Sequence, residues 1–262
     1  MSDDVVVTER EGHVLRIAVN RPDKRNAWNL EVIDAVAAAY QRLDDDSDLR
    51  VGVVHGVGEH FSAGLDLAEV GPEVAQRGPV ALSGRYDVDP FGVWAPPVAK
   101  PIVMAVHGIS YTLSIELALA SDIVVAASDV RFRQLEIGRG ILPFGGATFR
   151  APTQLGWGNA MRFLLTAEEF GSAEALRIGL VQEVVAPGEQ VQRAMQLAEL
   201  VAAQAPQGVQ ATLANARVGR DHGKQAAVED LMSVLPGILA SEDAVEGLRS
   251  FLERRDAVFT GR

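Results

Sequence analysis

The feature that most constrains the fold of this chain is a change of pattern near Pro187-Gly188. Before this point, short β-branched runs alternate with segments whose apolar residues recur at helical spacing, which is typical of α/β proteins. After it, the pattern is helical throughout, over residues 189–204, 206–218, 224–234 and 242–256. We therefore predict an α/β core over residues 1–187 and a C-terminal helical region over residues 188–262.

The N-terminal part begins with a predicted β-hairpin. Two β-branched runs flank Glu11-Gly12, and a glycine between such runs marks a turn. Asn29 is expected to cap the first helix. Residues 56–70 are expected to form a loop, and the proline-rich stretch that follows, up to Pro101, a long irregular segment that serves as a lid or a wrapping loop. Further strands are expected over residues 51–55, 101–108, 123–127 and 130–132, and a helix over residues 112–120.

Composition excludes several classes of function. The 262 residues carry a formal net charge of −11 and no cysteine, so the chain has no thiol nucleophile and no cysteine-based metal site. A strongly acidic chain is a poor general binder of nucleic acid or anionic membranes. The N-terminus lacks the basic and apolar regions of a signal peptide, so we expect a cytoplasmic protein with no membrane partner.

Two candidate ligand-binding patterns, a dinucleotide-binding loop and a histidine metal site, lack residues or spacings that they require. Gly56-Val57-Gly58 follows a predicted strand, but Phe61 occupies the position where a dinucleotide-binding loop needs its third glycine. The five histidines show no metal-ligand spacing, and His107, at a strand end, fits a packed histidine better than a catalyst. We therefore expect no metal site.

Two glutamates are candidate acid–base groups. Glu116 lies in a helical pattern that is apolar on nearly every face, where burial would raise the pKa of a carboxyl group. The same pattern equally fits an exposed glutamate on a narrow polar stripe with Thr112 and Ser114. Glu136 lies between two apolar residues where a strand ends. It could point into a cleft, although the sequence alone favours a surface loop carboxylate there.

Basic residues cluster near both ends of the chain. Arg21, Lys24 and Arg25 follow the second predicted strand, and Arg249, Arg254 and Arg255 lie on the last helix. Both clusters could bind phosphates, while those on the last helix could equally complement the helix dipole.

A series of short motifs resembles the crotonase superfamily, the enoyl-CoA hydratase/isomerase family, from about residue 5 to residue 262. In chain order the motifs are Asn20-Arg21-Pro22, Asn26-Ala27, Phe61-Ser62-Ala63-Gly64-Leu65-Asp66-Leu67, Ala105-Val106-His107-Gly108, Glu116-Leu117-Ala118, Ser121-Asp122, Gln134-Leu135-Glu136 and Gly145-Gly146. The resemblance implies a crotonase-like spiral core of ββα units with a C-terminal helical region. It also implies a homotrimer, or a dimer of trimers, assembled through that region.

The resemblance further implies chemistry on an acyl-CoA thioester. Its oxyanion hole would use the backbone N–H groups of Leu65 and Leu113. Glu136 would deliver a proton to C2, and Glu116 would orient and activate the water that adds to C3. The residues implied to bind substrate or CoA are Arg21, Lys24, Arg25, Ala63, Asp66, Phe251 and Arg254. CoA belongs to the substrate, so no separate cofactor is expected.

One departure from the family pattern concerns this hole. Thr112-Leu113-Ser114 stands where glycines are usual, which alters the shape of the pocket. Possession of both glutamates favours an enoyl-CoA hydratase. The alternatives are an enoyl-CoA isomerase or a CoA-thioester hydrolase of the same superfamily, and a catalytically weak acyl-CoA-binding member, because the fold does not fix the reaction.

Overall fold

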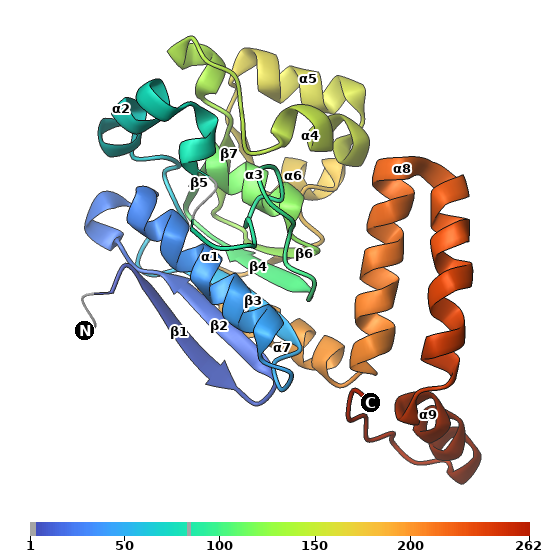
Figure 1. The fold of residues 1–262 in the computed structure, drawn as a ribbon. Helices are drawn as coiled ribbons and strands as arrows, with labels where there is room; N and C mark the ends of the chain where they lie inside the picture. Colours follow the sequence, from blue (N-terminus) through green and yellow to red (C-terminus); the bar gives the residue numbers. More distant parts are fainter. Residues whose placement is uncertain (1–3, 83–84) are drawn as a thin grey trace.

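A six-stranded sheet forms the centre of the protein. The computed structural model describes residues 4–82 and 85–262. The sheet has the order β1-β2-β3-β4-β6-β9, in which β1 and β2 form the expected antiparallel hairpin and every other pair is parallel (Figure 1). A smaller sheet has the order β5-β7-β8. The strands are β1 (Val6–Glu11), β2 (Val14–Val19), β3 (Val51–Gly56), β4 (Ile102–Val106), β5 (Ile109–Tyr111), β6 (Ile123–Ala127), β7 (Arg131–Arg133), β8 (Phe170–Gly171) and β9 (Glu183–Val185).

Helices cover both faces of the large sheet and continue beyond it. They are α1 (Leu30–Asp45), α2 (Leu67–Arg77), α3 (Leu113–Ala120), α4 (Ala147–Leu155), α5 (Trp157–Thr166), α6 (Ser172–Ile178), α7 (Gln190–Ala202), α8 (Pro206–Leu239) and α9 (Glu242–Glu253), with short 3-10 turns η1 (Pro22–Lys24), η2 (Pro79–Leu82) and η3 (Glu136–Arg139). Asn29 caps α1 as expected, because its side chain accepts a hydrogen bond from the N–H of Val32.

The central strands β4 and β6 are apolar along their whole length because both faces of the sheet are buried there. Along β4, Met104 and Val106 join the larger core cluster, whereas Val103 and Ala105 face the other side with α7. Successive side chains of a strand point to opposite faces, so each strand supplies both clusters.

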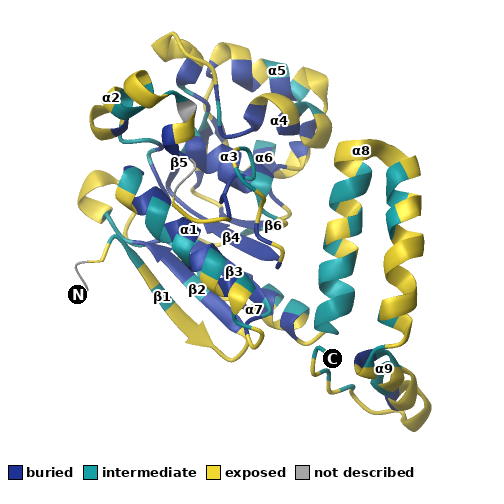
Figure 2. Ribbon diagram, in the orientation of Figure 1, coloured by how far each residue is buried: buried dark blue, intermediate teal, exposed yellow. Residues whose placement is uncertain are grey.

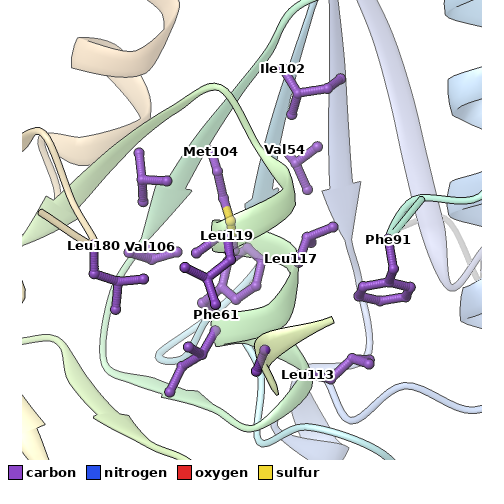
Figure 3. Close-up of a cluster of buried hydrophobic side chains, with 14 of the residues drawn as sticks. Val54, Phe61, Phe91, Ile102, Met104, Val106, Leu113, Leu117, Leu119 and Leu180 are labelled. Carbon is purple, nitrogen blue, oxygen red and sulfur yellow. The ribbon is translucent and has the colours of Figure 1, made fainter. Parts of the chain in front are cut away.

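The paired strands follow the course expected for ββα units. β4 joins the large sheet, β5 joins the small sheet, and α3 follows directly; β6 and β7 repeat the same division between the two sheets. The helix of the first unit is almost wholly enclosed, with seven of its eight residues buried. Figure 3 shows its Leu113, Leu117 and Leu119 within the cluster formed with the central strands. This burial places Glu116 in the interior.

One prediction about the irregular segment was wrong. Residues 56–70 and the proline-rich stretch were expected to lack regular structure, yet α2 begins at Leu67 and contains Pro72. Proline removes the N–H that would bond the carbonyl four residues earlier. That carbonyl belongs to Ala68, which is exposed, so water can replace the missing donor and the helix persists.

The last helices leave the core as a helical arm, which we define as α8 and α9, residues 206–253. α8 is broken at Gly223 (φ 86°, ψ 171°), which agrees with the two helices expected there, although the second continues to Leu239. Its two limbs lie side by side (Figure 1), joined by hydrogen bonds from the Asn215 side chain to Ala227 and Asp230. α9 ends at Glu253, earlier than expected.

The arm is much less buried than the core (Figure 2). α7 lies between the two parts in sequence but packs on the sheet through Ala194, Met195 and Ala198. The boundary expected between residues 187 and 188 therefore lies before α7, a helix that packs with the core. The division into two domains stays a prediction.

Candidate active site

Glu116 is a buried carboxylate held by backbone donors. Its side chain is 1% exposed and lies in the first turn of α3. One oxygen, Oε1, accepts hydrogen bonds from the N–H groups of Gly145 at 2.7 Å and Ala147 at 3.2 Å. These donors lie at the start of α4, where free N–H groups favour negative charge. The interpretation of Glu116 as a surface residue is excluded.

Glu136 is also buried, although its sequence context favoured the surface. It opens η3 and is 8% exposed. Its Oε1 accepts a hydrogen bond of 3.1 Å from the side chain of Gln134, whereas its Oε2 is buried with no partner among the described residues. A buried carboxyl oxygen without a partner is costly in a folded protein, and this is common where a group must meet a substrate.

Burial is the main influence on both carboxyl groups. It raises the pKa of Glu116 from 4.5 to about 7, and the nearby charge of Glu136 adds to this effect, while the two backbone donors oppose it. Burial also raises the pKa of Glu136 to about 7, against the hydrogen bond from Gln134. Near neutral pH a carboxyl group with such a pKa can both donate and accept a proton.

A cavity of about 210 Å³ lies beside Glu136. Its lining is mostly apolar, as in sites that bind organic ligands. The residues that line it are Ala63, Leu65, Leu67, Thr112, Leu135, Glu136, Arg139, Ile141 and Phe144. The structure thus brings together Ala63, Leu65 and Glu136, three of the residues expected at the site.

Two backbone segments converge at this cavity. The loop at Gly64 (φ 99°) lies against Thr112, so closely that a Cβ atom at position 64 would come 1.9 Å from Thr112 Oγ1. Glycine at 64 therefore permits the close approach. Within the described chain, the N–H groups of Leu65 and Leu113 donate no hydrogen bond.

The residues expected to bind CoA lie in two separate places. Arg21 is occupied within the chain: its guanidinium donates to Ala27 O and pairs with Asp66 and Glu69. Asp66 is therefore fixed as the partner of Arg21, whereas Lys24 and Arg25 are exposed on or beside η1.

The other group lies on the last helix, where Phe251 is 78% exposed and Arg254 caps the end of α9. Figure 1 shows α9 at the far end of the helical arm, so one chain alone does not join the two groups.

The sequence interpretation missed Arg150 as a supporting residue. This buried arginine on α4 donates to Gly145 O and to Gly92 O, each at 3.2 Å. It therefore steadies the segment that holds Glu116, and its charge lowers the pKa of that carboxyl group. The sequence offered one signal for this role, because Arg150 lies one helical turn after Gly146 of the Gly145-Gly146 motif.

Residues 4–82 and 85–262 contain no group of three or more histidine or acidic side chains placed to hold a metal ion. No helix in this part of the chain has both the length and the apolar composition to cross a membrane.

The ββα course of the strands and the helical arm define the class of protein, an enzyme of the crotonase fold. A family model described as enoyl-CoA hydratase/isomerase matches residues 9–262. The chain belongs to this family, which confirms the resemblance drawn from its motifs.

Individual relatives agree with this assignment. The chain is 33% identical to carnitinyl-CoA dehydratase of Salmonella heidelberg, with all of both chains covered. Its fold matches a probable enoyl-CoA hydratase/isomerase of Mycobacterium abscessus with a TM-score of 0.95 and 47% identity, covering 98% of this chain and 99% of the other. It matches an enoyl-CoA hydratase of Mycobacterium tuberculosis with a TM-score of 0.90 and 33% identity, covering 99% and 100%.

Proposed function

We propose that this chain is an enoyl-CoA hydratase-like lyase, which adds water across the 2,3 double bond of an acyl-CoA thioester. The observation that carries the proposal is the pair of buried glutamates whose pKa values are both raised to about 7. Addition of water needs one group that takes a proton and one that gives it. An isomerase or thioester hydrolase of the same family has less need of two such groups.

The thioester oxygen would be held by the N–H groups of Leu65 and Leu113. Their lack of partners in the described chain supports this assignment, as does the position of Leu113 at the start of α3, where the helix dipole favours negative charge. Negative charge grows on this oxygen as the enolate forms, so donors fixed in advance lower the barrier.

The glutamates would divide the proton transfers between them. Glu116 takes a proton from a water molecule as the oxygen of that water bonds to C3. Glu136 gives a proton to C2 of the resulting enolate, and the carbonyl of the thioester is restored. A proton then passes from Glu116 back to Glu136 by way of solvent, which restores both groups. The sum of these steps is the addition of one water molecule, and no separate cofactor is required.

The relatives support a reaction of this type. Carnitinyl-CoA dehydratase is named for the removal of water from a CoA thioester, which is the reverse direction of the same chemistry. The acyl group that this chain prefers is a separate question, because the residues around a shared catalytic centre set the specificity.

The test is direct assay with crotonyl-CoA, in which hydration removes the absorbance of the enoyl thioester. We expect turnover by the wild type and a loss of about 10²–10⁴-fold in kcat for Glu116→Gln and for Glu136→Gln. The double variant should lose far less than the product of the two losses, because both groups serve the same addition of one water molecule and act as a unit. Near-full hydration by Glu136→Gln would overturn the hydratase assignment. Loss only in Glu136→Gln would favour an isomerase.

A further inference from the structure

Thr112 occupies a backbone conformation that its side chain disfavours. It precedes α3 with φ 50° and ψ −109°, and a positive φ is costly for a β-branched residue. It is also the first residue of the stretch where the family resemblance predicts glycines. Because threonine adds strain at this position, we expect its side chain to make a contribution that offsets this cost.

The neighbouring structure imposes this conformation. The N–H of Thr112 donates to Arg133 O of β7 at 2.8 Å, and its carbonyl accepts the N–H of Ile115 at 2.8 Å. The first bond ties Thr112 to the small sheet and the second starts α3. The backbone therefore stays in place whichever side chain stands at this position.

The hydroxyl group of Thr112 is free for a ligand. A threonine at a helix N-cap usually accepts a hydrogen bond from the first turn of the helix, but here the side chain makes no such bond. Among the described residues, its hydroxyl forms no hydrogen bond. The side chain instead lines the cavity that contains Glu136.

The hydroxyl lies close to the segment that carries the first free N–H group. Its oxygen would be 1.9 Å from a Cβ atom at position 64, so it contacts the Cα atom of Gly64, and both Thr112 and Leu65 line the cavity. Leu113, which carries the second free N–H group, follows Thr112 directly in the chain.

We propose that the Thr112 hydroxyl is a third donor to the thioester oxygen, which makes Thr112 a catalytic residue. The inference rests on the proposed function, because it uses the same oxygen site. A donor fixed by an imposed backbone needs no reorganisation when the enolate forms. The hydroxyl then compensates for the strain that threonine adds at this position.

Three variants separate the hydroxyl from the shape of the side chain. Thr112→Val keeps the branching, and hence the strain, but loses the donor; we expect kcat on crotonyl-CoA to fall about 10²-fold, as for loss of one oxyanion-hole donor. Thr112→Ser should restore most of that loss. Thr112→Gly should lose activity as Thr112→Val does, yet unfold at a higher temperature, because glycine accepts a positive φ without strain. Thr212→Val makes the same chemical change on the exposed surface of α8 and controls for it.

A second measurement does not depend on turnover. Acetoacetyl-CoA forms an enolate whose ultraviolet absorbance reports its ionisation, and donors around its thioester oxygen favour that enolate. Bound to the wild type or to Thr112→Ser, it should ionise at lower pH than when bound to Thr112→Val. A purely structural role for Thr112 would leave this ionisation unchanged.

The outcomes distinguish this inference from the proposed function. If the wild type fails to hydrate crotonyl-CoA but the enolate shift depends on the hydroxyl, the hydratase assignment fails and the third donor stands. If hydration proceeds equally well in Thr112→Val, the third donor is overturned alone. Absence of any enolate shift between wild type and Thr112→Val, or failure of the wild type to bind acetoacetyl-CoA, also overturns it.

Discussion

The N–H of Gly145 donates a hydrogen bond of 2.7 Å to the Glu116 carboxylate, and its Cα atom lies against the same side chain. A Cβ atom at position 145 would come 2.8 Å from Glu116 Oε2 and 3.0 Å from its Cδ. The glycine therefore both supplies a donor and leaves the space that the carboxylate occupies. This contact fixes the direction in which Glu116 points.

Gly145→Ala is expected to displace the Glu116 carboxylate and to lower kcat on crotonyl-CoA by about 10²-fold, since small misplacements of a catalytic group are that costly. The measurement is steady-state kinetics together with thermal unfolding. Gly158→Ala on α5 is the matched control, because a Cβ atom there meets nothing within 4 Å. Equal activity in the two variants would show that Gly145 does not set the position of Glu116.

Glu136→Gln is expected to stabilise the protein at high pH. Because the folded-state pKa is raised from 4.5 to about 7, the folded protein retains a proton that the unfolded chain loses, and wild-type stability falls as the pH rises from about 4.5 to 7. The variant lacks this loss, so its advantage should grow from near zero at pH 4 to about 3 kcal/mol above pH 7. Urea unfolding across this pH range measures it.

Glu31→Gln, at an exposed position on α1, controls for the removal of one negative charge. An advantage of Glu136→Gln that stayed constant from pH 4 to pH 8 would contradict the raised pKa.

The helical arm is expected to mediate assembly, as a homotrimer or a dimer of trimers. Its exposed apolar side chains include Leu248, Phe251 and Leu252 on α9, and apolar surface gathered on one region marks an interface. Light scattering should give about three or six times the chain mass of 28.0 kDa. Leu248→Glu should reduce that mass, whereas Leu165→Glu, an exposed leucine on α5, should not. A wild-type monomer at micromolar concentration would exclude the assembly.

Arg254→Glu is expected to weaken CoA binding. One charge-assisted contact to a phosphate is worth about 1.5–3 kcal/mol, so KM should rise about tenfold or more. The value of kcat should change little, because a contact remote from the reacting atoms is the same in the ground and transition states. Arg249→Glu, on the same helix and exposed, serves as the control. Indistinguishable KM values for the two variants at low salt would show that Arg254 does not contact CoA.

Much of the fold could be predicted because local patterns coincide with the tertiary structure. The hairpin at Glu11-Gly12, the cap at Asn29 and the break at Gly223 all depend on a few neighbouring residues. The helix α2 was missed because the prediction relied on local signals alone, and Pro72 is a strong local signal against a helix. The helix forms because the carbonyl that loses its donor is exposed, and because residues distant in sequence hold the start of α2, as in the ion pairs of Arg21 with Asp66 and Glu69.

The family and the candidacy of the two glutamates follow from local sequence, because the motifs and the apolar context of Glu116 are readable from neighbouring residues. The burial of Glu136 does not, since the walls of the cavity enclose its side chain together with Gln134. Local sequence also does not show that Arg21 pairs with Asp66 or that Thr112 adopts a positive φ beside Gly64. These features depend on which distant segments meet, and that is set by packing of the whole chain rather than by any local pattern.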